Sequence, residues 1–443
     1  MSATEISPPP TETVKEERRR SAFLVLRHRD FRLLWLGQLI SVTGSQMQLV
    51  AINWHVWILT KSPLALGLVG LVRILPIIFC SLAGGVTADV FNRKKSMLVT
   101  QSTMLISAGI LAWITASGHV AVWSIYLLTA IASAAVAFDN PARQALLPAL
   151  VPKEEFPNAV SLGLVVFNLA MIIGPALGGL LLAPPGPRLA SLMKHSPLLT
   201  SMQGPALVYA LNAASFLAVI LALLMMRTAG RPIHEESQAS KVSLSALRDG
   251  LRFVWRTPII VQTMTLDFVA TFFASATALL PIFADEILHV GARGLGMLAS
   301  APAVGSVITG LVMARMGTIR KQGLVVINSI AVYGATTIAF GLSRYFYFSL
   351  AMLALMGAAD TVSTVLRQTI RQLVTPDYLR GRMTSINMVF FMGGPQLGEM
   401  EAGTVAALIG APLSVITGGI GCILAVIIAY AMAGTLKHYE WRH

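Results

Sequence analysis

The feature that most constrains this chain is a series of apolar runs of about 20 residues, which recur along nearly its whole length. Hydrophobic residues make up 55% of the 443 residues and charged residues only 12%, which is more apolar surface than a water-soluble globule can hide. As helices, such runs match the roughly 30 Å hydrocarbon core of a bilayer and satisfy their own backbone hydrogen bonds. We therefore expect an all-α integral membrane protein with twelve transmembrane helices.

The expected helices divide the chain into two bundles. The predicted spans are 33–58, 64–88, 96–117, 120–143, 159–183 and 206–227 in the first half, and 258–284, 292–315, 323–342, 346–370, 384–408 and 411–434 in the second. The domains are then a tail at 1–30, an N-terminal six-helix bundle at 31–227, a linker at 228–257, a C-terminal six-helix bundle at 258–434 and a tail at 435–443. In the linker, apolar residues at 244, 247, 251 and 254 recur at helical spacing with arginines on another face, which predicts a basic amphipathic helix on the cytoplasmic membrane surface.

An internal repeat relates the two halves. Arg143-Gln144 with Pro152 match Arg367-Gln368 with Pro376 at an offset of 224 residues, and Gly174-Pro175 with Gly178 match Gly394-Pro395 with Gly398 at an offset of 220. Helices 4 and 5 are therefore copied as helices 10 and 11. Because an even number of spans separates the copies, the two pseudo-repeats run parallel about an axis along the membrane normal, a design known for carriers.

The basic residues indicate which side of the membrane each loop faces. A formal charge of +13 would suit a nucleic-acid partner in a soluble protein. Here, however, Lys and Arg concentrate in the two tails, the linker and the loops after even-numbered spans. The loop after the tenth span is assigned Arg367, Arg371, Arg380 and Arg382. The opposite side receives only Lys61, Arg188, Lys194, Arg293 and Arg344. Both termini are thus predicted to be cytoplasmic, with no nucleic-acid partner. The first 20 residues lack an apolar signal-peptide segment, so the first span is expected to direct insertion.

The loop after the second span carries the most specific motif, GGVTADVFNRKK, which contains Gly84, Gly85, Asp89, Arg93 and Lys94. It resembles the loop motif of the major facilitator superfamily. That resemblance implies a carrier working by alternating access, in which Asp89 pairs with an arginine on helix 4 and latches the cytoplasmic ends of the two halves together. Arg143 is the available partner. The alternative is a solvated surface pair that contributes about 0 to 1 kcal/mol.

A second motif lies on helix 5, where Gly174, Pro175, Gly178 and Gly179 resemble the glycine–proline core associated with exporters of this superfamily. Pro kinks a helix and glycines let a neighbour approach closely, although small residues are common at any membrane helix contact. FRLLWLGQLISVTGSQMQ, SPLALGLVGL and MVFFMGGPQLGE also resemble the branch that contains the enterobactin exporter and macrolide efflux proteins. Many proton-coupled drug exporters have an arginine within helix 4, which 127–137 lacks, so proton coupling must use other groups.

Five ionisable residues are predicted at membrane depth, where an unpaired charge costs several kcal/mol: Arg73, Asp267, Asp360, Glu399 and Glu401. The carboxyl groups are candidate proton carriers, with Asp360 and Glu399 as the leading pair. The alternative is a structural ion pair with Arg73 or another arginine. Arg73 itself either meets an anionic substrate group or neutralises one of these carboxylates.

Four further polar residues are candidates for the lining of a substrate cavity: Asn53, His55, Trp57 and Asn212. Lone polar residues within a span more often form hydrogen bonds to a neighbouring helix. The two cysteines, Cys80 and Cys422, lie in apolar spans without a CxxC motif, so we expect no disulfide, no metal and no cofactor.

Together these features predict a monomeric secondary transporter of the bacterial inner membrane that uses protons to export a small amphipathic molecule, such as a drug, a siderophore or a metabolite. An importer, a lipid-handling protein or a sensor with the same fold is the alternative. A membrane-embedded enzyme is less favoured, because the sequence contains no P-loop, HExxH or GxSxG motif.

Overall fold

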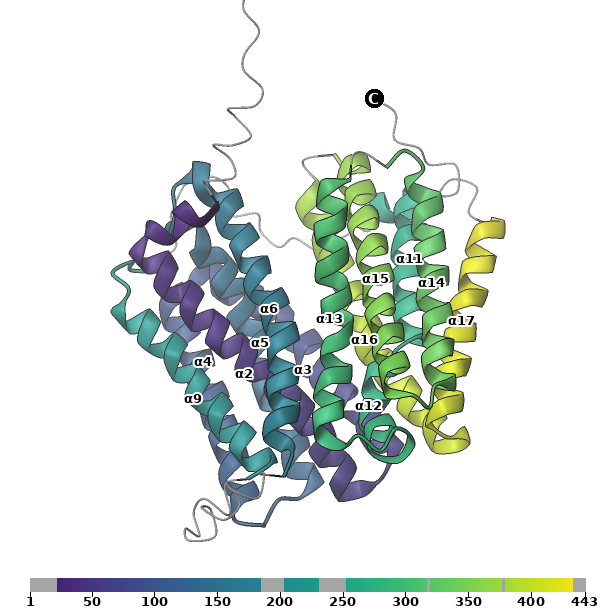
Figure 1. Cartoon of the computed structure of the whole chain (residues 1–443). Helices are drawn as coiled ribbons and strands as arrows, with labels where there is room; N and C mark the ends of the chain where they lie inside the picture. Colours follow the sequence, from purple (N-terminus) through teal and green to yellow (C-terminus); the bar gives the residue numbers. More distant parts are fainter. Residues whose placement is uncertain (1–21, 185–202, 231–251, 317–318, 377–378, 433–443) are drawn as a thin grey trace, which may run out of the picture.

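The computed structural model describes residues 22–184, 203–230, 252–316, 319–376 and 379–432, without some of the side chains in the second and eleventh long helices. Within these ranges all regular structure is helical (Figure 1). Ten of the described helices are long and apolar enough to cross a membrane, judged by length and composition. The predicted all-α membrane fold is therefore confirmed, while the predicted amphipathic helix of the linker lies largely in 231–251, outside the described residues.

Two bundles follow one another along the chain. The first contains α2 (Arg29–Thr60), α3 (Pro63–Val90), α4 (Arg93–Ala116), α5 (Val122–Leu146), α6 (Phe156–Leu182) and α9 (Pro205–Met225), with short helical turns η1 (Ala22–Arg27), η2 (Leu147–Ala149) and η3 (Lys153–Glu155). The second contains α11 (Pro258–Phe273), η4 (Ala276–Leu279), α12 (Leu280–Ile282), η5 (Phe283–Ile287), α13 (Gly291–Arg315), α14 (Gln322–Leu342), α15 (Phe346–Val374), α16 (Arg380–Ile409) and α17 (Ala411–Met432).

The same helix pairings occur in both bundles, as the internal repeat predicts. α2 packs on α6 and α9, α3 on α5, and α4 on α5 and α9; in the second bundle α11 packs on α16 and α17, α13 on α15, and α14 on α15 and α17. Between the bundles, α3 packs on α16 and α6 packs on α13. Since α3 corresponds to α13 and α6 to α16 in the repeat, these two contacts are equivalent. The two halves are thus pseudo-symmetric copies that meet through equivalent helices.

Local sequence signals explain where the helices begin. The Ser62 side chain accepts a hydrogen bond from the Ala65 N–H at 3.3 Å and Pro63 occupies the first turn of α3, a position that needs no amide hydrogen. Asn92 caps α4 in the same way, accepting from the Lys95 N–H at 3.1 Å. The two-residue linkers Lys61-Ser62 and Phe91-Asn92 make α2, α3 and α4 run antiparallel in sequence order.

The seventh predicted span, 258–284, is not one helix. α11 ends at Phe273, and the chain continues through η4, α12 and the π-helical turn η5 before α13 begins. Pro281 explains part of this break, because it has no N–H to donate to the preceding turn and its ring clashes with a continuing helix. The Tyr333 hydroxyl donates to the freed Ala274 carbonyl at 3.4 Å.

The assignment of Arg367 and Arg371 to a cytoplasmic loop was wrong. α15 continues to Val374, four residues beyond the predicted span, and both arginines lie on its buried face with Ser363 and Ile370. The side chain of Arg367 is only 1% exposed. Residues 363, 367, 370 and 371 follow helical spacing, so these arginines belong to the interior of the second bundle rather than to its surface.

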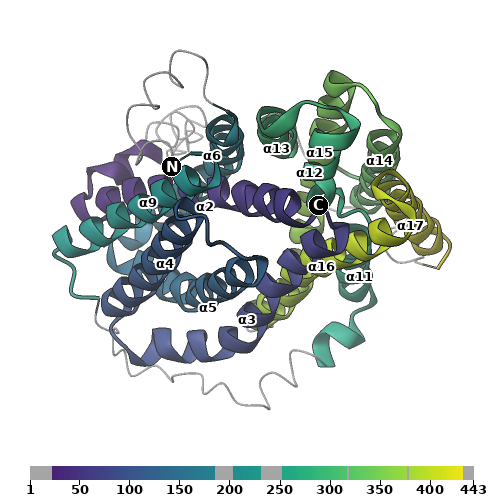
Figure 2. The same cartoon turned by 90° about the horizontal axis from the view of Figure 1, so that it is seen from below.

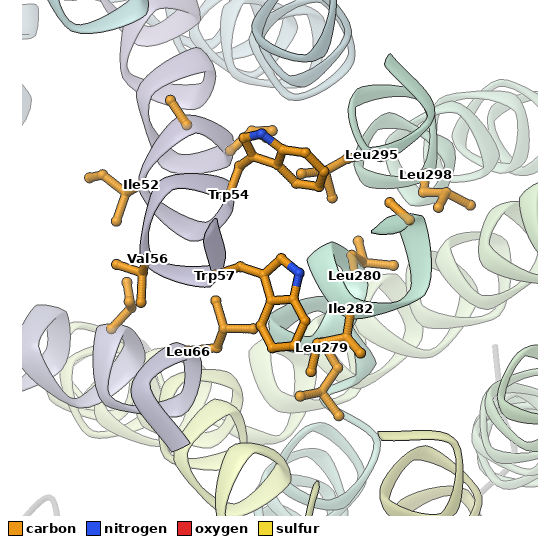
Figure 3. Packing of buried hydrophobic residues seen from close by; sticks show 14 of the residues in the cluster. Ile52, Trp54, Val56, Trp57, Leu66, Leu279, Leu280, Ile282, Leu295 and Leu298 are labelled. Atoms are coloured by element: carbon orange, nitrogen blue, oxygen red, sulfur yellow. The ribbon is translucent and has the colours of Figure 1, made fainter. Parts of the chain in front are cut away.

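We call the end of the molecule where α2 begins and α17 ends the terminal end, and the opposite end the distal end. The two bundles join near the distal end, which is the lower end in Figure 1 and faces the viewer in Figure 2. One apolar cluster there contains residues of both bundles, and Trp54 and Trp57 of α2 lie beside Leu295 of α13 and Leu280 of α12 (Figure 3). This shared core holds the distal ends of the halves together.

Candidate functional site

Two glycine-lined contacts join the bundles, and we call them the α3–α16 seam and the α6–α13 seam. In the first, a Cβ added to Gly403 would lie 2.7 Å from the Gly67 Cα. In the second, a Cβ added to Gly179 would lie 2.6 Å from the Gly296 Cα, and Ser300 donates to the Ile172 carbonyl at 2.8 Å. Neither seam has room for a larger residue at these points.

The exporter-like motif on helix 5 forms part of this packing. A Cβ on Gly174 would lie 2.4 Å from the Gln46 Cβ of α2, and one on Gly178 would lie 3.0 Å from the Met47 carbonyl oxygen. Gly179 contacts the other bundle, as described above, and Pro175 lies inside α6. The motif therefore joins α6 to α2 on one face and to α13 on another.

A charged contact at the distal end also links the bundles. Lys61, at the end of α2, forms an ion pair with Asp285 of η5, and the Trp57 indole N–H donates to the same carboxylate oxygen at 2.8 Å. The Lys61 ammonium lies 4.9 Å from the centre of the Trp57 ring. We call these three residues the distal clamp. Trp57, predicted to line a cavity, is instead 2% exposed and takes part in this closure.

The second bundle contains a buried charge cluster formed by Asp267 of α11 and Asp360 and Arg367 of α15. One Arg367 nitrogen, Nη2, lies 2.8 Å from the Asp267 carboxylate, 3.0 Å from the Thr364 hydroxyl and 3.9 Å from the Asp360 carboxylate. Asp267 is 3% exposed, whereas 45% of the Asp360 side chain is accessible. The structure thus brings two predicted carboxylates together on an arginine that was not predicted.

Arg371 lies one turn further along α15 and completes the cluster. It is 4% exposed, its Nη1 has no hydrogen-bond partner, and Asp267 acts on it electrostatically. With both aspartates ionised, the four side chains sum to zero charge. The helical spacing of 363, 367 and 371 together with Asp360 was the sequence signal that could have revealed this buried face.

Glu399 of α16 lies in the α3–α16 seam, where a Cβ on Gly70 would be 2.6 Å from its Oε2 atom. Arg73, one turn along α3, acts on Glu399 electrostatically but forms no direct ion pair with it. Glu401 is half-buried two residues further on, so it points to a different face of α16. Of the two, Glu399 is the one in the contact between bundles.

The polar candidates on α2 and α9 form hydrogen bonds to each other's helices. His55 Nδ1 lies 3.1 Å from the Tyr209 hydroxyl, with the rings 5.9 Å apart. The Asn212 amide donates to Gln48 at 2.7 Å. The side chains of His55 and Asn212 are buried, at 6% and 2% exposed, whereas Asn53 is half-buried. These contacts fit the alternative that such polar residues form hydrogen bonds to a neighbouring helix rather than line a cavity.

The predicted latch is described only in part. The side chains of Gly84, Gly85 and Asp89 lie outside the described residues. Arg143 donates to Gln38 and, at 2.5 Å, to the Asn140 amide oxygen. Arg93 donates to the Ala145 carbonyl at 2.9 Å and Lys94 to the Met226 carbonyl at 2.8 Å, so both basic residues tie α4 to neighbouring chain within the first bundle.

No group of three or more His, Cys, Asp or Glu side chains suited to a metal ion occurs in the described part of the chain. The charged groups that the described helices contain are ion pairs and carboxyl groups that can take up a proton. It fits a carrier whose two bundles move relative to one another.

Comparison with known proteins agrees with the fold. A family model described as transmembrane secretion effector matches residues 20–196 and 195–440. Among solved structures, a bacterial homologue of the human lysosomal transporter Spinster, inward-facing and unoccupied, has a TM-score of 0.71 at 13% identity over 93% of this chain and 98% of its own. A bacterial homologue of the iron transporter ferroportin, inward-facing, has a TM-score of 0.65 at 15% identity over 92% and 99%.

The fold and the paired seams define a secondary transporter built from two six-helix pseudo-repeats. The chain belongs to the transmembrane secretion effector family of the major facilitator superfamily. Enterobactin exporter EntS from Escherichia coli strain K12 is 25% identical over 417 residues, which are 94% of this chain and 95% of the relative. The protein of the same name from Citrobacter koseri is 24% identical over the same shares of the two chains.

Proposed function

We propose that this protein exports a small amphipathic molecule, with a siderophore as the first candidate, in exchange for protons. The observation that carries the coupling is Asp360: its side chain is 45% accessible, while its neighbours Asp267 and Arg367 are buried. A carboxyl group in that position can exchange protons with water from within a membrane bundle. The near full-length similarity to enterobactin exporters supports both the direction and the siderophore.

The roles within the charge cluster follow from the distances. Arg367 is engaged with Asp267 at 2.8 Å, so that pair is the structural link between α11 and α15. Asp360 lies 3.9 Å away and is accessible, so it is the member that gains and loses a proton. Glu399 is the second proton carrier, and Glu401 remains a weaker candidate because it lies outside the seam.

The contacts between bundles support alternating access. Both glycine seams and the distal clamp lie near the distal end, so the distal end is closed in this conformation. The concentration of basic residues at the terminal end supports a cytoplasmic location for that end and for both termini. The conformation is then inward-facing, ready to take up its substrate from the cytoplasm, and Asp89 with Arg143 would latch the opposite state.

The exposed aromatic residues support the proposed position in the bilayer. Trp113, Trp123, Tyr345 and Tyr347 are 68% to 83% exposed and lie at helix ends near the distal end. Such residues gather at the boundary between hydrocarbon and headgroups. One chain contains both bundles, and a monomer is the proposed working unit.

Uptake into inverted membrane vesicles tests the proposed function. With an acid-inside pH gradient, vesicles containing the protein should accumulate labelled iron-free enterobactin, and a protonophore should abolish the accumulation. Asp360→Asn should lose gradient-driven accumulation and keep substrate binding. Glu154→Gln removes an exposed carboxylate at the terminal end and should behave as the unaltered protein. Full gradient-driven accumulation by Asp360→Asn would reject Asp360 as the proton carrier, and a gradient without effect on the unaltered protein would reject proton coupling.

A further inference from the structure

The two seams that close the distal end are equivalent in the pseudo-repeat but differ in chemistry. Gly179 of α6 contacts Gly296 of α13, so the α6–α13 seam is formed by backbone atoms alone at that point. The repeat offset of 220 residues places Glu399 of α16 where the first copy has Gly179. One seam is therefore neutral, and the other contains a carboxyl group.

Glu399 fits into its seam because α3 has no side chain opposite it. A Cβ on Gly70 would lie 2.6 Å from Glu399 Oε2 and 2.8 Å from Glu399 Cβ, and one on Gly67 would lie 2.9 Å from the Glu399 carbonyl oxygen. Gly403, one turn later on α16, packs against Gly67 in turn. The Glu399 side chain is half-buried and packs directly against α3 of the other bundle when the distal end is closed.

The charged groups around Glu399 balance it only in part. Arg73 on α3 attracts it without forming a direct ion pair. On α11, Asp267 is engaged with Arg367; among its described residues, α17 contributes only Cys422 and Tyr430 as titratable groups, and η4 contributes none. An ionised carboxylate packed into this seam therefore lacks full compensation, whereas a protonated one is neutral.

We infer that Glu399 makes closure of the distal end depend on proton binding: the α3–α16 seam closes on the protonated side chain and opens when Glu399 ionises. The inference rests on the proposed alternating access and assigns Glu399 a role distinct from that of Asp360. When the distal end is open, Glu399 is exposed to the outer medium and takes up its proton there. Closure then carries the proton into the inward-facing state, and Glu399 releases it toward the cytoplasm before the distal end reopens, which is the direction that exchange for an exported molecule requires.

Distances across the two seams test this inference. In a background with Cys80→Ser and Cys422→Ala, spin labels on Leu64→Cys and Leu408→Cys report on α3 and α16, and labels on Leu180→Cys and Met297→Cys report on α6 and α13; all four side chains are exposed. In lipid nanodiscs, the share of molecules with long distances should rise for both pairs between about pH 5 and about pH 9, since ionisation opens the distal end.

Glu399→Gln has the shape of the protonated side chain and cannot ionise, so both label pairs should stay at the short distance at every pH. Glu399→Asp keeps a titratable group and should retain a pH response. That response would show that the position tolerates substitution, so that a missing response in Glu399→Gln is due to the lost ionisation. Glu286→Gln removes an exposed carboxylate of the same distal end and should respond as the parent does.

A parent distance that does not change with pH, or a Glu399→Gln protein that opens as the parent does, would overturn the inference. Neither result would by itself reject proton-driven export, because the vesicle assay reads accumulation independently. Conversely, a missing gradient effect in vesicles with intact pH-dependent opening would reject the proposed export and leave the role of Glu399 in place.

Discussion

The Arg367 guanidinium lies 2.8 Å from the Asp267 carboxylate, and neither side chain is more than 3% exposed. This ion pair connects the first and fourth long helices of the second bundle, α11 and α15. A buried pair of this kind contributes little net stability compared with well-packed apolar residues, but removal of one partner leaves an uncompensated charge.

Asp267→Asn should lower the free energy of unfolding by about 3 to 5 kcal/mol, because Arg367 would lose its closest negative partner inside the bundle. The double variant Asp267→Asn with Arg367→Met should recover most of that loss, since it removes both charges. Thermal unfolding in detergent measures both. A double variant as unstable as the single one would contradict the structural role of the pair.

Gly179→Ala should disfavour the closed distal end by about 1 to 3 kcal/mol, because the added Cβ would lie 2.6 Å from both the Ala292 carbonyl oxygen and the Gly296 Cα. Gly163→Ala on the same helix is the matched control, since nothing lies within 4 Å of its added Cβ. The control should be neutral or stabilising by up to about 1 kcal/mol. Thermal unfolding and the distance across the α6–α13 seam report the two effects. Equal behaviour of both variants would show that close backbone contact does not limit the seam.

Lys61→Ala should increase opening of the distal end, because it removes the cation of the distal clamp. The pair is partly exposed, so its contribution is about 0 to 1 kcal/mol, and the open population should rise by at most about fivefold. Ala284→Cys, at a position that is 0% exposed, provides the reporter through its labelling rate with a membrane-impermeant maleimide.

The charge-swapped protein with Lys61→Asp and Asp285→Lys should label more slowly than Lys61→Ala. Lys153→Ala, at an exposed terminal-end position, is the control. Labelling of the swapped protein at the rate of Lys61→Ala would mean that the ion pair does not hold the distal end closed.

The first turn of α2 contributes stability that depends on pH. Asp30 lies before the first predicted span and accepts hydrogen bonds from the Arg227 N–H at 3.0 Å, the Thr228 N–H at 2.9 Å and the Thr228 hydroxyl at 2.6 Å. Burial alone would raise the pKa of Asp30, but these hydrogen bonds outweigh it and hold the pKa below the ordinary value of 3.8.

Because the pKa is lower in the folded protein, the contribution of Asp30 is complete above the ordinary pKa and is lost as pH falls through the folded pKa. The difference in thermal midpoint between the unaltered protein and Asp30→Asn should therefore be constant near neutral pH and shrink below about pH 4. A difference that stays the same down to acidic pH would contradict this assignment.

The sequence predicted the helices better than it predicted the partners of their side chains. Length and apolar composition define a membrane helix almost alone, so the boundaries of α3, α13 and α14 agree with the predicted spans to within a few residues. The break after Phe273 was not predicted, because the region around Pro281 is as apolar as a continuous span. Hydropathy measures only how apolar the side chains are, so it does not detect a helix that breaks inside the protein.

The sequence indicated the two aspartates of the charge cluster but not its two arginines. Asp267 and Asp360 stood out as carboxylates within apolar runs, but Arg367 and Arg371 lie near a helix end, where the same residues also fit a positively charged loop. Only packing distinguishes the two, since α15 continues past them with both side chains inside. His55 shows the converse: its partner Tyr209 is on a helix far along the chain, which no local pattern reveals.

Two of the contacts that close the distal end are backbone against backbone, at Gly67 with Gly403 and at Gly179 with Gly296. Closing a contact between flexible side chains restricts their rotamers, and each transport cycle would have to overcome that loss of conformational entropy again. Glycine has no rotamers to restrict. The two halves can therefore separate and rejoin at these points with little entropic penalty, which suits a surface that must be broken and remade in every turnover.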